Sequence, residues 1–175
     1  MATSVTTETG VRPVHRVAKE LVANTGFLLA RLGFAFKAKA LARLEQAGFD
    51  PYDYSVLAIL DEGARQTQSN IADALALDPS RLVALLDSLE ERRLVVRQRD
   101  PLDRRRHVVS ITPEGKKQLL RLRDIAAELE EDFFAPLDHE SRAALHELLA
   151  RLAADVDPRC AFSPEAGTAA TDSSA

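Results

Sequence analysis

The amino-acid sequence predicts a mainly α-helical protein with one β-hairpin. Apolar residues recur at helical spacing along most of the 175-residue chain, which is the pattern of amphipathic helices. Ala, Leu, Arg and Glu are plentiful, whereas the chain has only 7 glycines and 8 prolines, a composition that favours helix. Two β-branched runs, at residues 94–97 and 107–111, flank a polar loop and are typical of a hairpin.

The first predicted helix covers residues 17–47 and follows a polar segment, residues 1–14, which we expect to be a disordered tail. Leu28, Leu32 and Phe36 lie on one face of this helix, but further apolar residues lie on its other faces. A helix that is apolar around most of its circumference has to be buried on several sides. Because a small domain can hardly cover it alone, we expect a partner subunit.

Capping residues predict the next helices. An Asp-Pro pair, at residues 50–51 and again at 78–79, supplies an N-cap followed by a proline in the first turn. Thr67 is an N-cap candidate for a short helix between these two. The short helix and the one that follows it meet at a tight corner, residues 76–78, which gives a helix-turn-helix pattern.

The hairpin comes next, and two more helices complete the pattern. Residues 112–115, Thr-Pro-Glu-Gly, combine an N-cap, a first-turn proline and an acidic residue, and a last helix covers residues 137–156. The order helix, turn, helix, hairpin is that of a winged helix-turn-helix. The predicted fold is therefore mainly α, with a two-stranded β-wing and flanking terminal helices. Residues 158–175 are small, polar and without period, so we expect a disordered tail.

Charge is distributed unevenly along the chain. The net charge is −4, yet residues 64–123 carry 13 Lys and Arg against 8 Asp and Glu. This asymmetry points to an anionic partner for the middle of the chain and another role for the ends. Three consecutive arginines at the hairpin tip would repel one another unless an anion faced them, which favours DNA over a merely solvated loop.

Several classes of protein are disfavoured. The sequence has no Gly-rich phosphate loop, nucleophile elbow or paired-carboxylate arrangement, so we expect no enzyme. Its four histidines are scattered and Cys160 is the only cysteine, so we expect no metal and no cofactor. The most apolar run, residues 27–36, contains Arg31 and is too short for a bilayer. Residues 1–14 are polar and lack the apolar core of a secretory signal, so we expect no such signal and a cytoplasmic protein.

The segment DPLDRRRHVVSITPEG, residues 100–115, closely resembles the wing signature of the multiple-antibiotic-resistance-regulator (MarR) family. The order of elements from about residue 17 to 156 is also similar. The resemblance implies a homodimeric bacterial transcription regulator, usually a repressor, whose terminal helices form the dimer interface and whose DNA binding is weakened by small, often phenolic, ligands. It implies one family domain over residues 15–157, with a DNA-binding core of about residues 50–117.

The sequence departs from the family pattern at two places. Val83 and Ala84 stand where the family often has a threonine and a basic residue, and Arg93 replaces a glycine that commonly precedes the first wing strand. These departures leave the predicted fold unchanged, but they prevent the assignment of any residue to a particular base.

The predicted partner is double-stranded DNA with a pseudo-palindromic operator. A recognition helix meets the major groove with its exposed N-terminal face, while wing arginines suit minor grooves and phosphates. The resemblance further implies that Asp103 orients Arg105. The candidate DNA contacts are Gln68, Ser69, Ser80, Arg81, Val83, Ala84, Arg97, Arg99, Arg104, Arg105 and Arg106.

Aromatic residues give a candidate effector site. The resemblance implies a ligand cavity between the dimer helices and the winged module, where Phe27, Phe34, Phe36, Tyr52 and Tyr54 would converge. Ordinary core packing is the alternative role of each. A different function also stays open, namely a winged-helix module that binds an acidic protein partner or binds DNA without regard to sequence.

Overall fold

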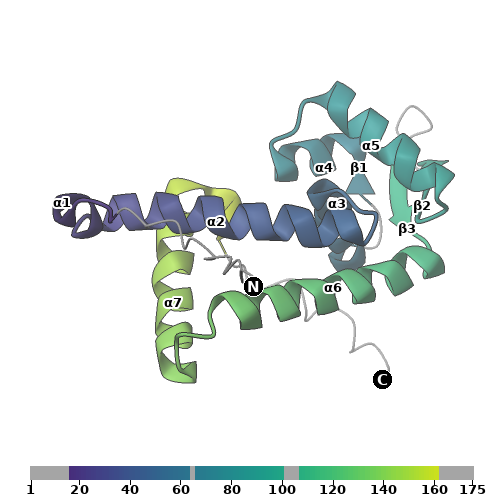
Figure 1. Ribbon diagram of the computed structural model, residues 1–175. Helices are drawn as coiled ribbons and strands as arrows, with labels where there is room; N and C mark the ends of the chain where they lie inside the picture. The colour runs from purple at the N-terminus through teal and green to yellow at the C-terminus, as the bar shows by residue number, and fades with distance from the viewer. Residues whose placement is uncertain (1–15, 64–65, 101–106, 162–175) are drawn as a thin grey trace, which may run out of the picture. The chain divides into compact units, whose positions relative to one another are not determined.

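The computed structural model describes residues 16–63, 66–100 and 107–161 (Figure 1). The chain divides into two units, Met1–Ala38 and Lys39–Ala175, with the boundary inside the long helix α2. The second unit contains the helix-turn-helix and the hairpin, so the mainly helical winged helix-turn-helix predicted from the sequence is confirmed.

The first unit holds α1 (Lys19–Val22) and the beginning of α2 (Thr25–Gln46). The expectation of one continuous helix over residues 17–47 was wrong, because the chain breaks at Asn24. Its side-chain Oδ1 accepts the N–H of Phe27 at 2.9 Å and so begins a new helix. At the other end of α2, Gly48 has a left-handed backbone with φ of 79°, which ends the helix as expected.

Local caps begin the helices of the second unit. These are α3 (Pro51–Glu62), α4 (Gln68–Leu75) and α5 (Pro79–Glu91). The predicted N-caps are confirmed: Asp50 accepts the N–H of Tyr52, and Thr67 accepts that of Asn70. Asp78 likewise caps α5. At the corner between α4 and α5, the chain turns through Ala76 with φ of 49°.

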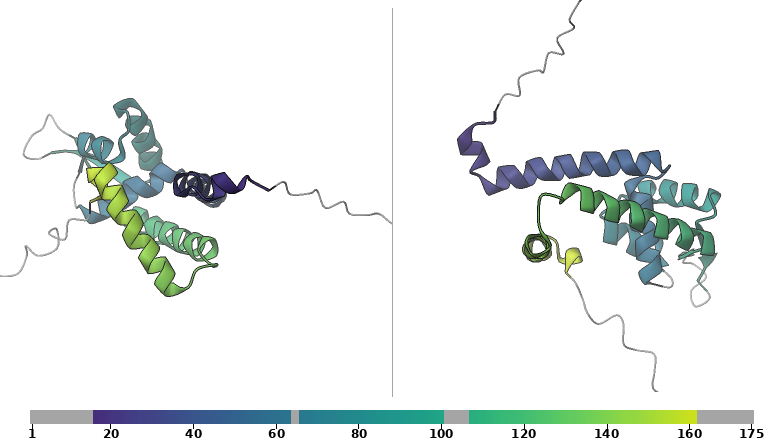
Figure 2. Two further views of the ribbon diagram at one scale, coloured as in Figure 1. Left: turned by 90° about the vertical axis from the view of Figure 1, so that its left-hand side faces the viewer. Right: turned by 60° about the horizontal axis from the view of Figure 1, so that its bottom comes forward.

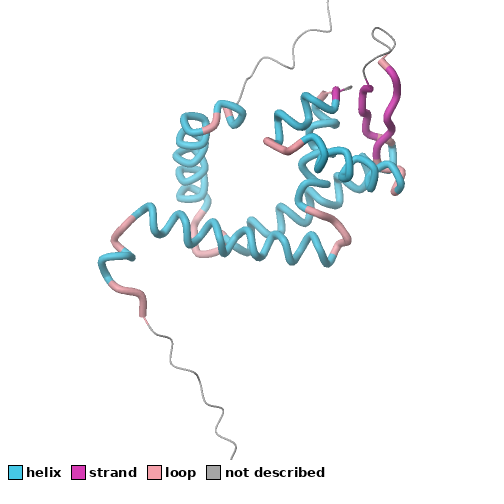
Figure 3. The backbone as a smooth tube through the Cα atoms, turned by 90° about the horizontal axis from the view of Figure 1, so that it is seen from above, coloured by secondary structure: helices cyan, strands magenta, loops and turns pink. Residues whose placement is uncertain are grey.

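The wing consists of β2 (Val95–Arg99) and β3 (His107–Ile111), paired antiparallel with Val95 opposite Ile111 and Arg99 opposite His107. A third strand, β1 (Gln66–Thr67), pairs antiparallel with the other side of β3, so the order is β1-β3-β2 (Figure 3). This strand was not predicted, because two residues are too few to show an alternating pattern.

The hairpin leads directly into α6 (Pro113–Phe133), which is followed by α7 (His139–Val156) and a 3-10 turn, η1 (Pro158–Cys160). Thr112 caps α6 by accepting the N–H of Gly115 at 3.0 Å. Helices α6 and α7 run in different directions after the bend that joins them (Figure 2). Residues 158–160 were expected to lie in the tail and instead form η1, while residues 162–175 lie outside the described residues.

The core of the second unit holds α5 in place. Its fully buried side chains come from α3, α4, α5, the wing strands and α6, namely Val56, Leu57, Leu60, Ile71, Leu82, Leu86, Leu89, Val95, Val109, Leu119 and Leu122. Helix α5 therefore buries one face and exposes the other. By contrast, α7 has no buried residue, although it carries several leucines.

Arg93 provides a test of backbone strain. It lies between α5 and β2 with φ of 59°, in the left-handed region where a side chain costs about 1–2 kcal/mol. We expect Arg93→Gly to raise the free energy of unfolding by about 0.5–1 kcal/mol, since relief of strain exceeds the added chain entropy. Denaturant titration measures this change. Arg93→Ala, which keeps the Cβ, should give no such gain, and a less stable glycine variant would contradict the argument.

Candidate nucleic-acid interface

The outer face of α5 carries the predicted recognition residues. Arg81, Val83 and Ala84 are exposed, whereas Leu82 and Leu86 on the opposite face are buried. Exposed residues near the N-terminus of a supported helix are suited to reach base edges in the major groove. The structure therefore gives α5 the form that the sequence predicted, while the contacts of individual residues stay predictions.

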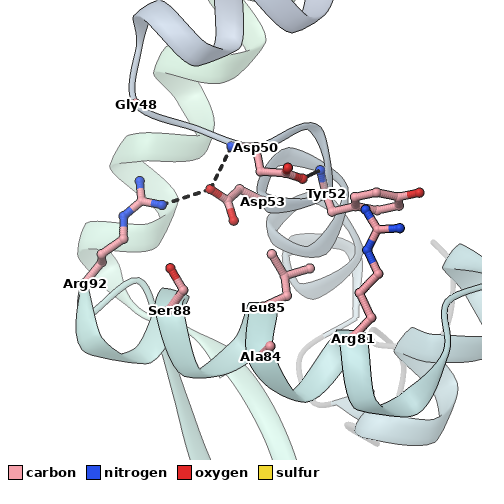
Figure 4. Close-up of a pocket in the computed structure, with 9 residues that line it drawn as sticks. All are labelled: Gly48, Asp50, Tyr52, Asp53, Arg81, Ala84, Leu85, Ser88 and Arg92. Atoms are coloured by element: carbon pink, nitrogen blue, oxygen red, sulfur yellow. Dashed lines mark hydrogen bonds and ion pairs between the residues drawn. The ribbon is translucent and has the colours of Figure 1, made fainter.

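Arg81 is held by an aromatic neighbour. Its Cζ lies 4.5 Å from the centroid of the Tyr52 ring, so the guanidinium stacks on the first turn of α3 (Figure 4). Ser80 is also engaged, because both its N–H and its hydroxyl donate to Asp78 Oδ1. These bonds lower the pKa of Asp78 below its ordinary value. Arg81 and Ser80, both in the first turn of α5, thus each have a partner within the protein.

A pocket of about 400 Å³ lies between the start of α3 and α5 (Figure 4). In its wall, Asp53 is only 3% exposed and accepts hydrogen bonds from the N–H of Asp50, at 3.1 Å, and from Arg92 Nη1, at 2.9 Å. The pocket is lined by Gly48, Asp50, Tyr52, Asp53, Arg81, Ala84, Leu85, Ser88 and Arg92. Asp53 and Arg92 thus join α3 to the end of α5.

Of the five aromatic residues predicted to line a ligand cavity, only Tyr52 lines this pocket. Tyr54 is half-buried and packs against the core of the second unit. The three phenylalanines belong to the first unit, where Phe27 and Phe36 are half-buried and Phe34 is 77% exposed. The aromatic ligand cavity therefore stays a prediction.

Arg97, a predicted DNA contact, is bound to α5. Its Nε and Nη2 donate to Glu90 Oε2 at 2.8 and 2.6 Å, and Nη2 also donates to Asp87 at 2.5 Å. Its backbone N–H donates to Glu90 Oε1 at 3.0 Å. The hydrogen bonds from Arg97 lower the pKa of Glu90, and the bond to Glu90 raises the pKa of Arg97. Sequence reasoning missed both carboxylates, although their three-residue spacing on one helix face was a readable signal.

The remaining candidates lie at the start of α4 and on the wing. Gln68 is half-buried and Ser69 exposed, and both follow β1 directly, so they lie beside the wing strand β3 with which β1 pairs. Arg99 is exposed at the outer end of β2. Asp103, Arg104, Arg105 and Arg106 lie outside the described residues.

The described residues contain neither a group of side chains suited to bind a metal ion nor a helix suited to span a membrane. Across residues 16–63, 66–100 and 107–161, no group of three His, Cys, Asp or Glu side chains could hold a metal ion. Within the same ranges, no helix combines the length and the apolar character that crossing a membrane requires.

Known proteins share this arrangement. A family model described as MarR family matches residues 47–106, the region from the start of α3 into the wing. The putative transcriptional regulatory protein for the hcr operon of Thauera aromatica is 32% identical over 149 residues, which cover 81% of this chain and 89% of that protein.

Two solved structures of a repressor agree with this chain in fold. The transcriptional repressor CouR bound to a 23-mer DNA duplex gives a TM-score of 0.70 at 33% identity, over 80% of this chain and 99% of that one. CouR from Rhodococcus jostii RHA1 bound to p-coumaroyl-CoA gives a TM-score of 0.67 at 30% identity, over 83% of this chain and 99% of that one. Since the agreement in sequence extends over nearly the whole of these relatives, this chain belongs to the MarR family of transcriptional regulators.

Proposed function

We propose that this protein is a homodimeric, DNA-binding transcriptional repressor of the cytoplasm that a small aromatic ligand releases from its operator. The observation that carries the proposal is that α5 exposes one face and is bonded elsewhere to a hairpin. The loop of this hairpin contains three consecutive arginines in the sequence. The similarity to CouR bound to a DNA duplex supports it. No catalytic role forms part of the proposal.

In the proposed complex, α5 occupies the major groove. Arg81 reaches guanine O6 and N7, a contact worth about 1–3 kcal/mol of discrimination, and Val83 packs on a thymine methyl. Ala84 lets the helix approach closely, while Ser80 and the start of α4, Gln68 and Ser69, contact phosphates. In a second copy, the same helix enters the next major groove, about 34 Å away.

The wing occupies the neighbouring minor groove. Arg99, Arg104, Arg105 and Arg106 supply positive charge there, and Asp103 orients Arg105 through a charge-assisted bond. A narrow minor groove concentrates negative potential, which favours inserted arginines. These contacts add affinity and set the position of α5 on the duplex.

Exposed apolar side chains support the homodimer. The first unit exposes Val17, Leu21, Val22, Leu28, Leu29, Leu32 and Phe34, and α7 exposes Leu148, Leu149, Leu152 and Val156. Apolar surfaces of this extent are characteristic of protein interfaces. We infer that a second copy of the chain covers them, as the family resemblance implies.

Ligand release is proposed from the same family. CouR has been solved with p-coumaroyl-CoA, and we propose that a small aromatic compound likewise binds to this protein. A ligand that prefers a dimer with altered spacing of its two α5 helices lowers operator affinity by shifting the population of states. The ligand acts only through the difference in its affinity for the two states.

The wing provides the test of DNA binding. Arg105→Ala combined with Arg106→Ala should lower affinity for DNA from the protein's own upstream region about tenfold at 0.1 M salt. The plot of log K against log salt should flatten by about 2, since two positive charges that neutralise the duplex are lost. Fluorescence anisotropy with labelled duplexes measures both quantities.

A control variant and a control duplex make this test selective. Arg121→Ala removes an exposed arginine of α6 and should leave the slope unchanged. A duplex of the same composition in shuffled order should bind at least about 1,000-fold more weakly. Equal binding to both duplexes would contradict a sequence-specific repressor and favour nonspecific DNA binding. An absence of DNA binding would favour an acidic protein partner.

A further inference from the structure

Asp87, Glu90 and Arg97, which we call the wing clamp, join the hairpin to the recognition helix. Glu90 uses both carboxylate oxygens on one residue of β2: Oε1 accepts the backbone N–H of Arg97, and Oε2 accepts its Nε and Nη2. Because one of these bonds is to the main chain, the clamp fixes the path of the strand as well as a side chain. Asp87 adds a bond to Nη2.

The clamp joins the middle of strand β2 to the second half of helix α5. Arg97 lies opposite Val109 at the middle of β2, with only two further pairs between it and the loop at the tip. Asp87 and Glu90 lie three residues apart on α5, about one and two turns after the exposed Val83 and Ala84. The clamp therefore joins the helix proposed for the major groove to the hairpin proposed for the minor groove.

The charges of the clamp argue against a phosphate contact by Arg97. Its side chain is 23% exposed and has two carboxylate partners. Nε and Nη2 already donate to these carboxylates, so a phosphate that approached the guanidinium would bring its negative charge close to Asp87 and Glu90. An arginine bound by a forked carboxylate interaction is held in a fixed geometry, as a positioning role requires.

We propose that Arg97 is a positioning residue, which sets the orientation of the wing relative to α5 and does not itself contact DNA. The proposal rests on the proposed DNA-binding function and differs from the sequence prediction that Arg97 binds DNA directly. The two roles make opposite predictions for the partner carboxylate. Loss of Glu90 should weaken DNA binding if Arg97 positions the wing, and should strengthen it if the loss frees Arg97 for phosphate.

The test compares R97A, E90A and the control E91A with the wild-type protein on DNA from its own upstream region. We expect R97A to lower affinity about tenfold and E90A about threefold, as for residues that act without touching the ligand. The slope of log K against log salt should stay within about 0.3 of wild type for both variants, because no phosphate contact is lost. E91A removes an exposed carboxylate next to the clamp and should bind at least as tightly as wild type.

Two outcomes would overturn the proposal: a slope that R97A flattens by about 0.9, the value for one phosphate contact, or an E90A variant that binds more tightly than wild type. Hydrogen exchange of the free protein tests the clamp without DNA. Amides of residues 95–99 and 107–111 should exchange faster in R97A and E90A than in E91A, and equal rates would also overturn the proposal. If the wild-type protein does not recognise its upstream DNA, the proposed function fails, whereas the exchange experiment still decides the clamp.

Discussion

Leu148→Glu combined with Leu152→Glu should convert the dimer to a monomer and lower operator affinity at least about 100-fold. Both side chains are more than half exposed, at 56% and 58%, on a helix in which no residue is fully buried. In the proposed dimer these leucines are covered, and two unpaired carboxylates in their place would be strongly unfavourable. A monomer then binds one half-site at a time, and loses the gain in affinity that a dimer has from binding both half-sites at once.

Sedimentation velocity and DNA titration measure the two effects separately. Ala150→Glu is the matched control, because residue 150 is exposed on the opposite face of the same helix, and it should leave both the dimer and its affinity intact. A double variant that stays dimeric would place α7 outside the interface. A monomeric variant that keeps full affinity would contradict the two-half-site geometry.

Gly115→Ala is expected to lower the free energy of unfolding by about 3 kcal/mol, at the upper end of the usual cost of overpacking. Gly115 is buried in the first turn of α6, where a Cβ would overlap the carbonyl oxygen of Leu94 and lie 2.8 Å from Cγ1 of Ile111. Main-chain atoms cannot move aside as a flexible side chain can. The Leu94 carbonyl also accepts the N–H of Thr112, so its displacement would disturb the junction of wing and helix.

Thermal unfolding at one fixed protein concentration measures this loss, which corresponds to a fall in Tm of about 6–12 °C for a chain of this size. Gly33→Ala is the control, since a Cβ at position 33 in α2 meets nothing within 4 Å, and the better helix propensity of alanine should leave stability unchanged or slightly raised. An alanine variant at 115 as stable as wild type would show that the Leu94 carbonyl can move at little cost.

Helix starts could be predicted from the sequence because a cap is a local interaction. Asp50, Thr67, Asp78 and Thr112 each accept an N–H two or three residues further along, so the relevant partners are visible in a short window. Asn24 could have been recognised by the same rule, but the apolar run around it suggested a continuous helix. The core face of α5 could also be predicted from the sequence, because its leucines repeat at helical spacing.

Contacts between elements could not be predicted in the same way. The bonds between Arg97 and the two carboxylates of α5 depend on how the chain turns from helix to strand, and that turn passes through Arg93 in a left-handed conformation. Net positive charge in the hairpin therefore suggested a DNA contact for Arg97, and gave no sign of its bonds to Asp87 and Glu90. Strand β1 could not be predicted, because its pairing with β3 joins residues about 40 positions apart, Gln66 with Val109.

Thr67 has two roles in adjacent elements, with no spacer between them. Its backbone lies opposite Val108 in the sheet, and its hydroxyl caps the helix that starts at the next residue. Sliding β1 by a single residue along β3 would turn its side chains to the opposite face of the sheet, and would shift the start of α4 with it. Most junctions between surface elements accept inserted residues, but an insertion after position 67 would uncouple the sheet register from the helical phase, so this junction should have a fixed length.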